Sequence, residues 1–256
     1  MFGTVIIDAY KKDEKEQIAN ALDDLCSPCD TFGWASAGVY CFWDYYSKEI
    51  LYIGLAADLC DRFKQHNGII IVDDNSCKRK QIDAYFNIKE KIGYSIFVQS
   101  PLSQPITHRN ERIYRELLGA EFLREDYVGQ EGQDHIKQVE GILIEAYRKA
   151  NGDFPLWNRM GGSLYGQQVA SIGNYEIVKS FYDFEPNPIV ARYSLRELSD
   201  NTMYAGFENY LHAVRMSMLM SGMNFGDALE FHNKIDSINR YQQMIDNGYF
   251  NKRLRV

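Results

Sequence analysis

The stretch GVYCFWDYYSKEILYIG, residues 38–54, predicts a β-hairpin. β-branched and aromatic residues dominate 38–43 and 50–54, which is typical of two strands joined by a turn. A symmetric turn would place Tyr40 opposite Tyr52, with both phenols on one face of the sheet. Such a pair is compatible with ordinary aromatic packing or with half of an active site, and the hairpin alone leaves both interpretations open.

The segment after the hairpin predicts a short helix with a cationic face. Asp58 is a suitable N-cap, and Asn67-Gly68 is a suitable end for a helix that runs to about His66. Arg62 and His66 are four residues apart and therefore share one face of that helix. A guanidinium can hold phosphate oxygens through two parallel hydrogen bonds, and an imidazole can move a proton near neutral pH. Beside two phenols, these groups favour phosphodiester cleavage.

Hydrophobic periodicity predicts an α+β chain around this hairpin. A third core strand is expected at 94–100 and a short strand at 69–72, and 129–134 is expected to be a loop. Beyond residue 162 the pattern is mostly helical. Helical spacing favours the ranges 13–25, 78–91, 107–124, 134–150, 196–222 and 226–247.

The helix expected at 134–150 carries a carboxylate on its apolar face. Glu140 has apolar neighbours at helical spacing, whereas Glu145 is expected to face solvent. A carboxylate on a buried stripe requires a cationic partner, such as an arginine in the core, or a metal ion. Because phosphodiester hydrolysis near neutral pH usually uses a divalent cation, Glu140 is the candidate ligand.

These residues belong to a longer ordered set. In chain order the set is Gly38-Val39-Tyr40, Tyr52-Ile53-Gly54, Arg62 and His66 ten and fourteen residues after Tyr52, Glu140 before Leu143-Ile144, and Pro155-Leu156-Trp157-Asn158. Over about residues 36–162 this order resembles the GIY-YIG nuclease superfamily. The resemblance implies an α+β fold with a small three-stranded antiparallel sheet flanked by helices.

The resemblance also divides the chain into a nuclease domain and additions to it. Residues 1–35 become an N-terminal extension, and about 101–135 an insertion in the domain. Residues 163–256 become a mostly helical C-terminal region, a candidate element for DNA recognition or dimerisation. A homodimer would suit a two-fold symmetric DNA site.

The chemistry implied by the resemblance is hydrolysis of DNA with one divalent metal ion. Glu140 would bind Mg²⁺ or Mn²⁺, and Arg62 would stabilise the charge on the transferring phosphate. Tyr40 is the first choice for activating the attacking water, and Tyr52 is the alternative. His66 would orient or deprotonate the tyrosine.

By the same resemblance, Asn158 would help to shape the site. The sequence also departs from the family pattern at three places. Leu55 follows Gly54, where small or polar residues are usual, and about forty residues separate the third strand from the metal helix. Lys48 lies four residues before Tyr52, whereas many members place a lysine two residues before that tyrosine, so Lys48 has no assigned role.

Two basic segments are candidates for contact with DNA. They are Lys78, Arg79 and Lys80, and, in the insertion, Arg109, Asn110 and Arg112. Arginine and asparagine suit bidentate contacts with guanine and adenine edges, although a solvated helix face is the alternative for each segment. The net charge of −7 argues mildly against a polyanionic partner but permits a basic groove.

The expected function is a sequence-specific, restriction-type DNA endonuclease, because FPLWN, Gly161-Gly162 and the later SFYDF are similar to restriction members of the superfamily. A homing or structure-specific DNA endonuclease is the next interpretation. An RNA nuclease also stays open. A non-catalytic nucleic-acid-binding module on the same fold is the alternative from a different class.

Cysteine usage and hydropathy favour a cytoplasmic location. The cysteine count is odd, five, which fits reduced thiols better than a disulfide framework. Cys26-Ser-Pro-Cys29 has the spacing of a zinc or redox pair, but a turn with two buried thiols is the simpler interpretation. The chain shows no apolar run of membrane-spanning length and no signal-peptide pattern at its N-terminus.

Overall fold

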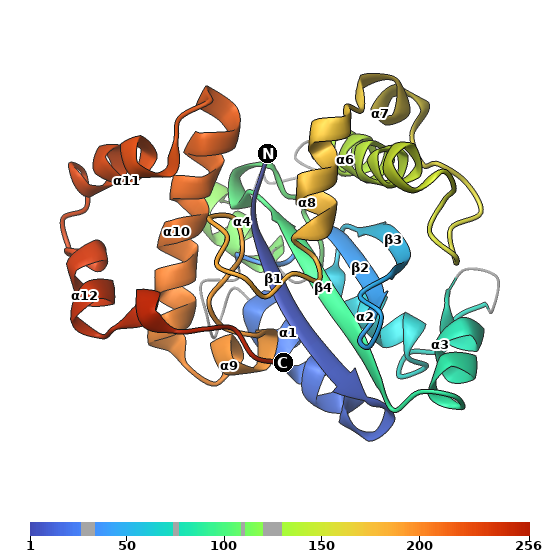
Figure 1. Cartoon of the computed structure of the whole chain (residues 1–256). Helices are drawn as coiled ribbons and strands as arrows, with labels where there is room; N and C mark the ends of the chain where they lie inside the picture. The colour runs from blue at the N-terminus through green and yellow to red at the C-terminus, as the bar shows by residue number, and fades with distance from the viewer. Residues whose placement is uncertain (27–33, 74–76, 109–110, 120–129) are drawn as a thin grey trace.

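The computed structural model describes residues 1–26, 34–73, 77–108, 111–119 and 130–256 (Figure 1). Its centre is a four-stranded antiparallel sheet in the order β1-β4-β2-β3. The strands are β1 (Phe2–Lys11), β2 (Gly38–Asp44), β3 (Ile50–Ala56) and β4 (Lys91–Gln99). The α+β class is therefore confirmed.

The expectation of three strands is wrong by one. Residues 2–11 form β1, which pairs with β4 along its whole length. Nearly every residue of β1 is buried, because one sheet face packs on one core and the other face on a second core. A strand covered on both faces reads as a continuous apolar run without alternation, which is ambiguous in a sequence.

The β2–β3 hairpin forms, but its register differs from the symmetric prediction. Tyr40 pairs with Gly54, and Phe42 pairs with Tyr52. An irregularity between Phe42 and Trp43 shifts the pairing near the turn. The two tyrosines are thus offset by two residues. Because side chains alternate with a period of two, both still lie on the same face, with ring centroids 5.9 Å apart.

The helices surround the sheet, and several differ from their predicted bounds. Residues 69–72 do not form a strand, and residues 130–134 belong to a helix rather than a loop. Each of the two long C-terminal ranges splits into two helices. The helices are α1 (Lys15–Cys26), α2 (Leu59–His66), α3 (Arg79–Phe86), α4 (Glu111–Leu118), α6 (Gln130–Asn151), α7 (Leu164–Val169), α8 (Tyr175–Lys179), α9 (Leu195–Ser199), α10 (Thr202–Ser221), α11 (Phe225–Asn233) and α12 (Arg240–Asp246).

The sheet lies between two apolar layers. Buried side chains of α1, α2 and α9 pack on one face, and those of α6 and α8 pack on the other. At the β1 edge, Val5 donates to Ile189 O and accepts from Ala191 N, both at 2.8 Å. At the β3 edge, Trp157 N donates to Leu51 O at 2.8 Å. Covered edges prevent pairing with other chains.

The C-terminal region contributes to this body through a buried ion pair. Arg215 and Glu208 of α10 form a salt bridge and are 2% and 0% exposed. Arg215 also donates to Thr4 Oγ1 at 2.9 Å, and Tyr249 donates to Glu208. This network ties α10 and Tyr249 to β1, and Figure 1 shows α10 and the C-terminus on the β1 side of the sheet. Among the described residues, no helix is both long enough and apolar enough to cross a membrane.

Candidate active site

The cationic face of α2 meets the tyrosine face of the hairpin. Asp58 caps α2 by accepting from Asp61 N at 2.8 Å, and buried Leu59 and Phe63 fix the helix on the sheet. This orientation turns Arg62 and His66 towards β2 and β3. Two predictions are confirmed: Asp58 is the N-cap of the helix, and Arg62 and His66 lie on the same helix face.

Tyr40 is the buried centre of the cluster. Its side chain is 1% exposed. Its hydroxyl lies 2.6 Å from His66 Nε2 and accepts from Arg62 Nε at 3.2 Å. The Tyr52 ring lies beside the Tyr40 ring, with the two ring centroids 5.9 Å apart. Burial is the main cause that raises the pKa of Tyr40 well above its ordinary value, and the charge of Arg62 opposes that rise.

The hydrogen bonds of His66 fix its protonation. The backbone N–H of Lys78 donates to His66 Nδ1 at 2.8 Å, so Nδ1 carries no proton. The ring is fully buried, and burial, Arg62 and Lys78 hold its pKa well below its ordinary value. His66 is therefore neutral with its proton on Nε2, and it donates to the Tyr40 hydroxyl.

Tyr52 is the phenol that reaches the surface of the site. It is partly exposed, and it lies close enough to Tyr40 and Arg62 for both to act on its hydroxyl. The Lys78 ammonium lies 4.6 Å from the centre of its ring. Burial and the charge of Glu140 raise the pKa of Tyr52, and the Tyr40 hydroxyl and the charge of Arg62 oppose this rise.

The two motif glycines are required by close packing. A Cβ at Gly54 would lie 2.6 Å from the Tyr40 hydroxyl oxygen and 2.6 Å from the Tyr52 ring. A Cβ at Gly38 would lie 2.1 Å from the backbone oxygen of Phe97. Gly54 thus gives the Tyr40 ring its place over β3, and Gly38 allows β2 to approach β4.

Glu140 of α6 brings a carboxylate to the same place. It lies close enough to Arg62 and Tyr52 for electrostatic interaction with both, and a Cβ at Gly162 would lie 3.1 Å from its Oε2. Burial raises its pKa to about 7, although the charge of Arg62 and the nearby Leu55 N–H oppose the rise. A partly buried carboxylate that is costly to ionise fits a divalent-cation ligand, because Mg²⁺ is often held by one carboxylate together with waters and substrate phosphates.

Glu145, expected to face solvent, is instead covered. Its side chain is 7% exposed and pairs with Arg148 at 2.7 Å, and this pair lowers the pKa of the carboxyl. Arg148, three residues later on the same helix, is the partner of this carboxylate in place of the solvent that was expected. Glu145 therefore does not share the environment of Glu140.

Asn158 acts on the backbone of β3. Its Oδ1 accepts from Ile53 N at 2.9 Å, and its Nδ2 donates to Ile53 O at 2.8 Å. The amide thereby pairs with the outer edge of the strand that carries Tyr52. These contacts fix the position of Asn158 on the strand, and its expected part in shaping the site stays a prediction.

Arg159 is an exposed cation near the candidate site that sequence reasoning missed. The pKa of Lys78 is lowered mainly by burial, and next by the charges of Arg159 and Arg62. The three cations are therefore near one another. The sequence offered one signal for Arg159: it directly follows Asn158, the last residue of the motif that is expected to shape the site.

The other basic candidates are spread over the surface. Lys48, at φ 62°, places its ammonium over Trp43, Tyr45 and Phe184 instead. In the basic segments, Arg79 pairs with Asp83 at 3.7 Å, Arg112 pairs with Glu116 at 3.5 Å, and Lys80 is exposed, while Arg109 and Asn110 lie outside the described residues.

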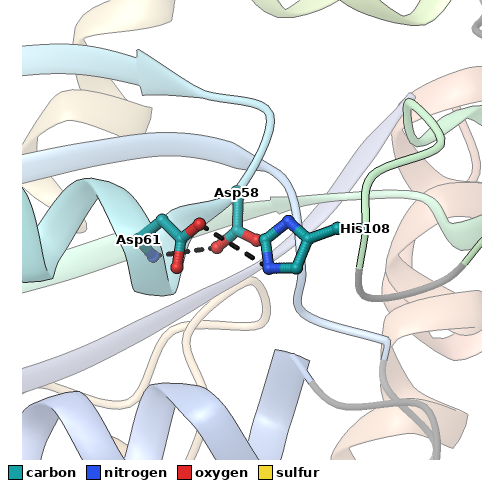
Figure 2. Close-up of side chains that lie close together, drawn as sticks. All are labelled: Asp58, Asp61 and His108. Atoms are coloured by element: carbon teal, nitrogen blue, oxygen red, sulfur yellow. Dashed lines mark hydrogen bonds and ion pairs between the residues drawn. The ribbon is translucent and has the colours of Figure 1, made fainter.

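Two other groups could hold a metal ion in principle. Asp58, Asp61 and His108 come together at the start of α2, and His108 Nε2 lies 3.8 Å from Asp61 Oδ2 (Figure 2). Asp58 is already the helix cap, so this group has a structural explanation. Cys26 is buried and donates to Ala35 O at 3.2 Å, and its predicted partner Cys29 lies outside the described residues.

Comparison with known proteins adds no relative. No family model matches the chain, and neither does any curated protein or solved structure.

Proposed function

We propose that the chain is a divalent-metal-dependent DNA endonuclease that hydrolyses phosphodiester bonds. The single observation that carries the proposal is the convergence of two phenols, Arg62, neutral His66 and the partly buried Glu140 from three parts of the chain. Arg62, Lys78 and Arg159 give the site an excess of positive charge that suits a phosphodiester. A cluster that served only packing would not need a carboxylate at a place where burial makes its ionisation unfavourable.

The hydrogen bonds support Tyr52 over Tyr40 as the phenol that contacts the attacking water. The Tyr40 oxygen already accepts from His66 Nε2 and Arg62 Nε, so both of its lone pairs are used. Its own proton is then directed to Tyr52, which is partly exposed. Tyr52 therefore contacts and orients the attacking water at the surface of the site, and Tyr40 holds Tyr52 from beneath.

In this mechanism His66 orients rather than deprotonates. With Nδ1 accepting from Lys78 N, the ring has no free lone pair for the Tyr40 proton. Arg62 contacts both phenols and is positioned to stabilise charge on the transferring phosphate. Glu140 is the ligand for Mg²⁺ or Mn²⁺, which would polarise a phosphoryl oxygen when bound.

Within this activity, a sequence-specific, restriction-type enzyme is the form that we propose. The motif order and the restriction-like segments around FPLWN support it. Incubation of the protein with DNA of known sequence and Mg²⁺ tests the proposal. Discrete fragments in Mg²⁺ and none in EDTA are expected. A smear would remove sequence specificity, and the absence of any metal-dependent cleavage on plasmid or genomic DNA would remove the nuclease.

A further inference from the structure

Large apolar side chains are exposed beside the candidate active site. Leu156 and Met160 are 74% and 77% exposed, although Pro155 and Gly161 next to them are buried. Leu164 and Tyr165, at the start of α7, continue this exposure at 75% and 61%. A concentration of bulky apolar side chains in solvent marks a contact surface more often than chance placement.

The segment that carries Leu156 and Met160 is fixed at both ends. Trp157 and Asn158 hydrogen-bond to the outer edge of β3. At the other end, a Cβ at Gly162 would lie 3.1 Å from Glu140 Oε2. The segment therefore runs along the site from the β3 edge to Glu140, and it presents its two exposed side chains from an anchored backbone.

The charge beside these side chains selects the partner. Arg159 lies between Leu156 and Met160, and it acts with Arg62 on Lys78. In a two-fold dimer the same patch faces itself, so the cations of one copy would meet those of the other. A polyanion has the complementary charge. The occupant that fits both the apolar side chains and the cations is a nucleic-acid duplex.

We propose that Leu156 and Met160 are wedges that insert between stacked base pairs of duplex DNA held at the active site. The inference rests on the proposed nuclease function and specifies how the substrate is held. Apolar side chains of this kind unstack a base step and kink the duplex, while neighbouring cations hold its phosphates. The substrate is then DNA deformed at the cleavage point, and the deformability of that step contributes to specificity.

A linking-number assay on closed circular plasmid tests the wedge without cleavage. The protein is bound to plasmid in EDTA, a metal-independent topoisomerase relaxes the DNA, and the topoisomers are separated after protein removal. Wild-type protein is expected to shift the topoisomer distribution, because unstacking unwinds the duplex. Leu156→Ser/Met160→Ser is expected to lose the shift while still binding the plasmid in a filter assay. Ile235→Ser, which removes a 69% exposed side chain from the C-terminal region, is the matched control and is expected to keep it.

Three results would overturn the wedge. They are plasmid binding by the wild type without a shift, an unchanged shift in the double variant, and a change in solution mass from dimer to monomer in that variant, which would make the surface a contact between copies. Plasmid nicking in Mg²⁺ is measured in parallel. A protein that nicks plasmid but leaves the linking number unchanged retains the proposed function and lacks the wedge, whereas a protein that does neither lacks both.

Discussion

Replacement of Glu140 by glutamine should stabilise the metal-free protein while removing its activity. Burial raises the pKa of Glu140 from 4.5 to about 7. Because one pKa unit corresponds to about 1.4 kcal/mol, ionising this carboxyl in the fold destabilises the protein by up to roughly 3 kcal/mol. Glutamine keeps an oxygen for the Leu55 N–H and carries no charge. We expect a gain of about 1–3 kcal/mol at pH 8, since local relaxation reduces the upper bound.

The stability difference between the wild type and the Glu140→Gln variant should depend on pH. Below pH 4.5 the carboxyl is protonated in both the folded and the unfolded chain, and the glutamine variant has no advantage from this source. Between pH 4.5 and 7 the unfolded chain ionises first, so the stability of the wild type falls relative to the variant. Above pH 7 the difference is constant.

Thermal unfolding of both proteins in EDTA at pH 5 and pH 8 measures this difference. The melting temperature of the variant should exceed that of the wild type at pH 8 by about 3–8 °C, and by much less at pH 5. Glu145→Gln is the matched control on the same helix. The pKa of Glu145 is lowered by Arg148, so this variant should lose stability at pH 8. A Glu140→Gln variant that is less stable at pH 8, or whose advantage does not grow with pH, would refute the reasoning.

Three further predictions concern the packing and charge of the site. Gly54→Ala should destabilise the protein by about 1–3 kcal/mol in chemical denaturation and abolish cleavage, because the new methyl meets the Tyr40 hydroxyl at 2.6 Å, whereas Gly173→Ala, whose Cβ has its nearest neighbour at 3.7 Å, should be close to neutral. Asn158→Ala should speed amide hydrogen exchange at Ile53 and cost about 1–3 kcal/mol, because it unpairs buried backbone groups, while Asn151→Ala, at an exposed helix end, should leave Ile53 unchanged. Lys78→Met should slow plasmid nicking about tenfold or more by removing a cation beside Tyr52, and Lys48→Met, which alters only a distant aromatic contact, should nick at the wild-type rate; equal rates for the two lysine variants would contradict the charge assignment.

The local features of the site could be predicted from the sequence because they depend on short-range rules. Asp58 caps α2, and the four-residue spacing places Arg62 and His66 on one face. The alternation of strand residues places Tyr40 and Tyr52 on one face even though the predicted register is shifted by two. A shift of two residues leaves each side chain on the predicted face of the sheet, but it changes which residues pair across the strands.

Features that depend on tertiary packing were not predictable in the same way. β1 has two covered faces and therefore no alternation, so its strand character is hidden in the sequence. The tautomer of His66 is set by the Lys78 N–H twelve residues away. Arg159 comes near Lys78 in the fold, where the neighbouring Asn158 is hydrogen-bonded to β3. Glu145 differs from expectation because a single neighbouring arginine covers it.

Cleavage of supercoiled plasmid by wild type, Glu140→Gln and Glu145→Gln, in Mg²⁺ and in EDTA, tests the central claim most directly. Wild type and Glu145→Gln should nick the plasmid in Mg²⁺ and not in EDTA. Glu140→Gln should be slower by about 100-fold or more, as is typical when a group that stabilises the transition state is removed. Equal nicking by Glu140→Gln and wild type, or nicking that persists in EDTA, would contradict the account.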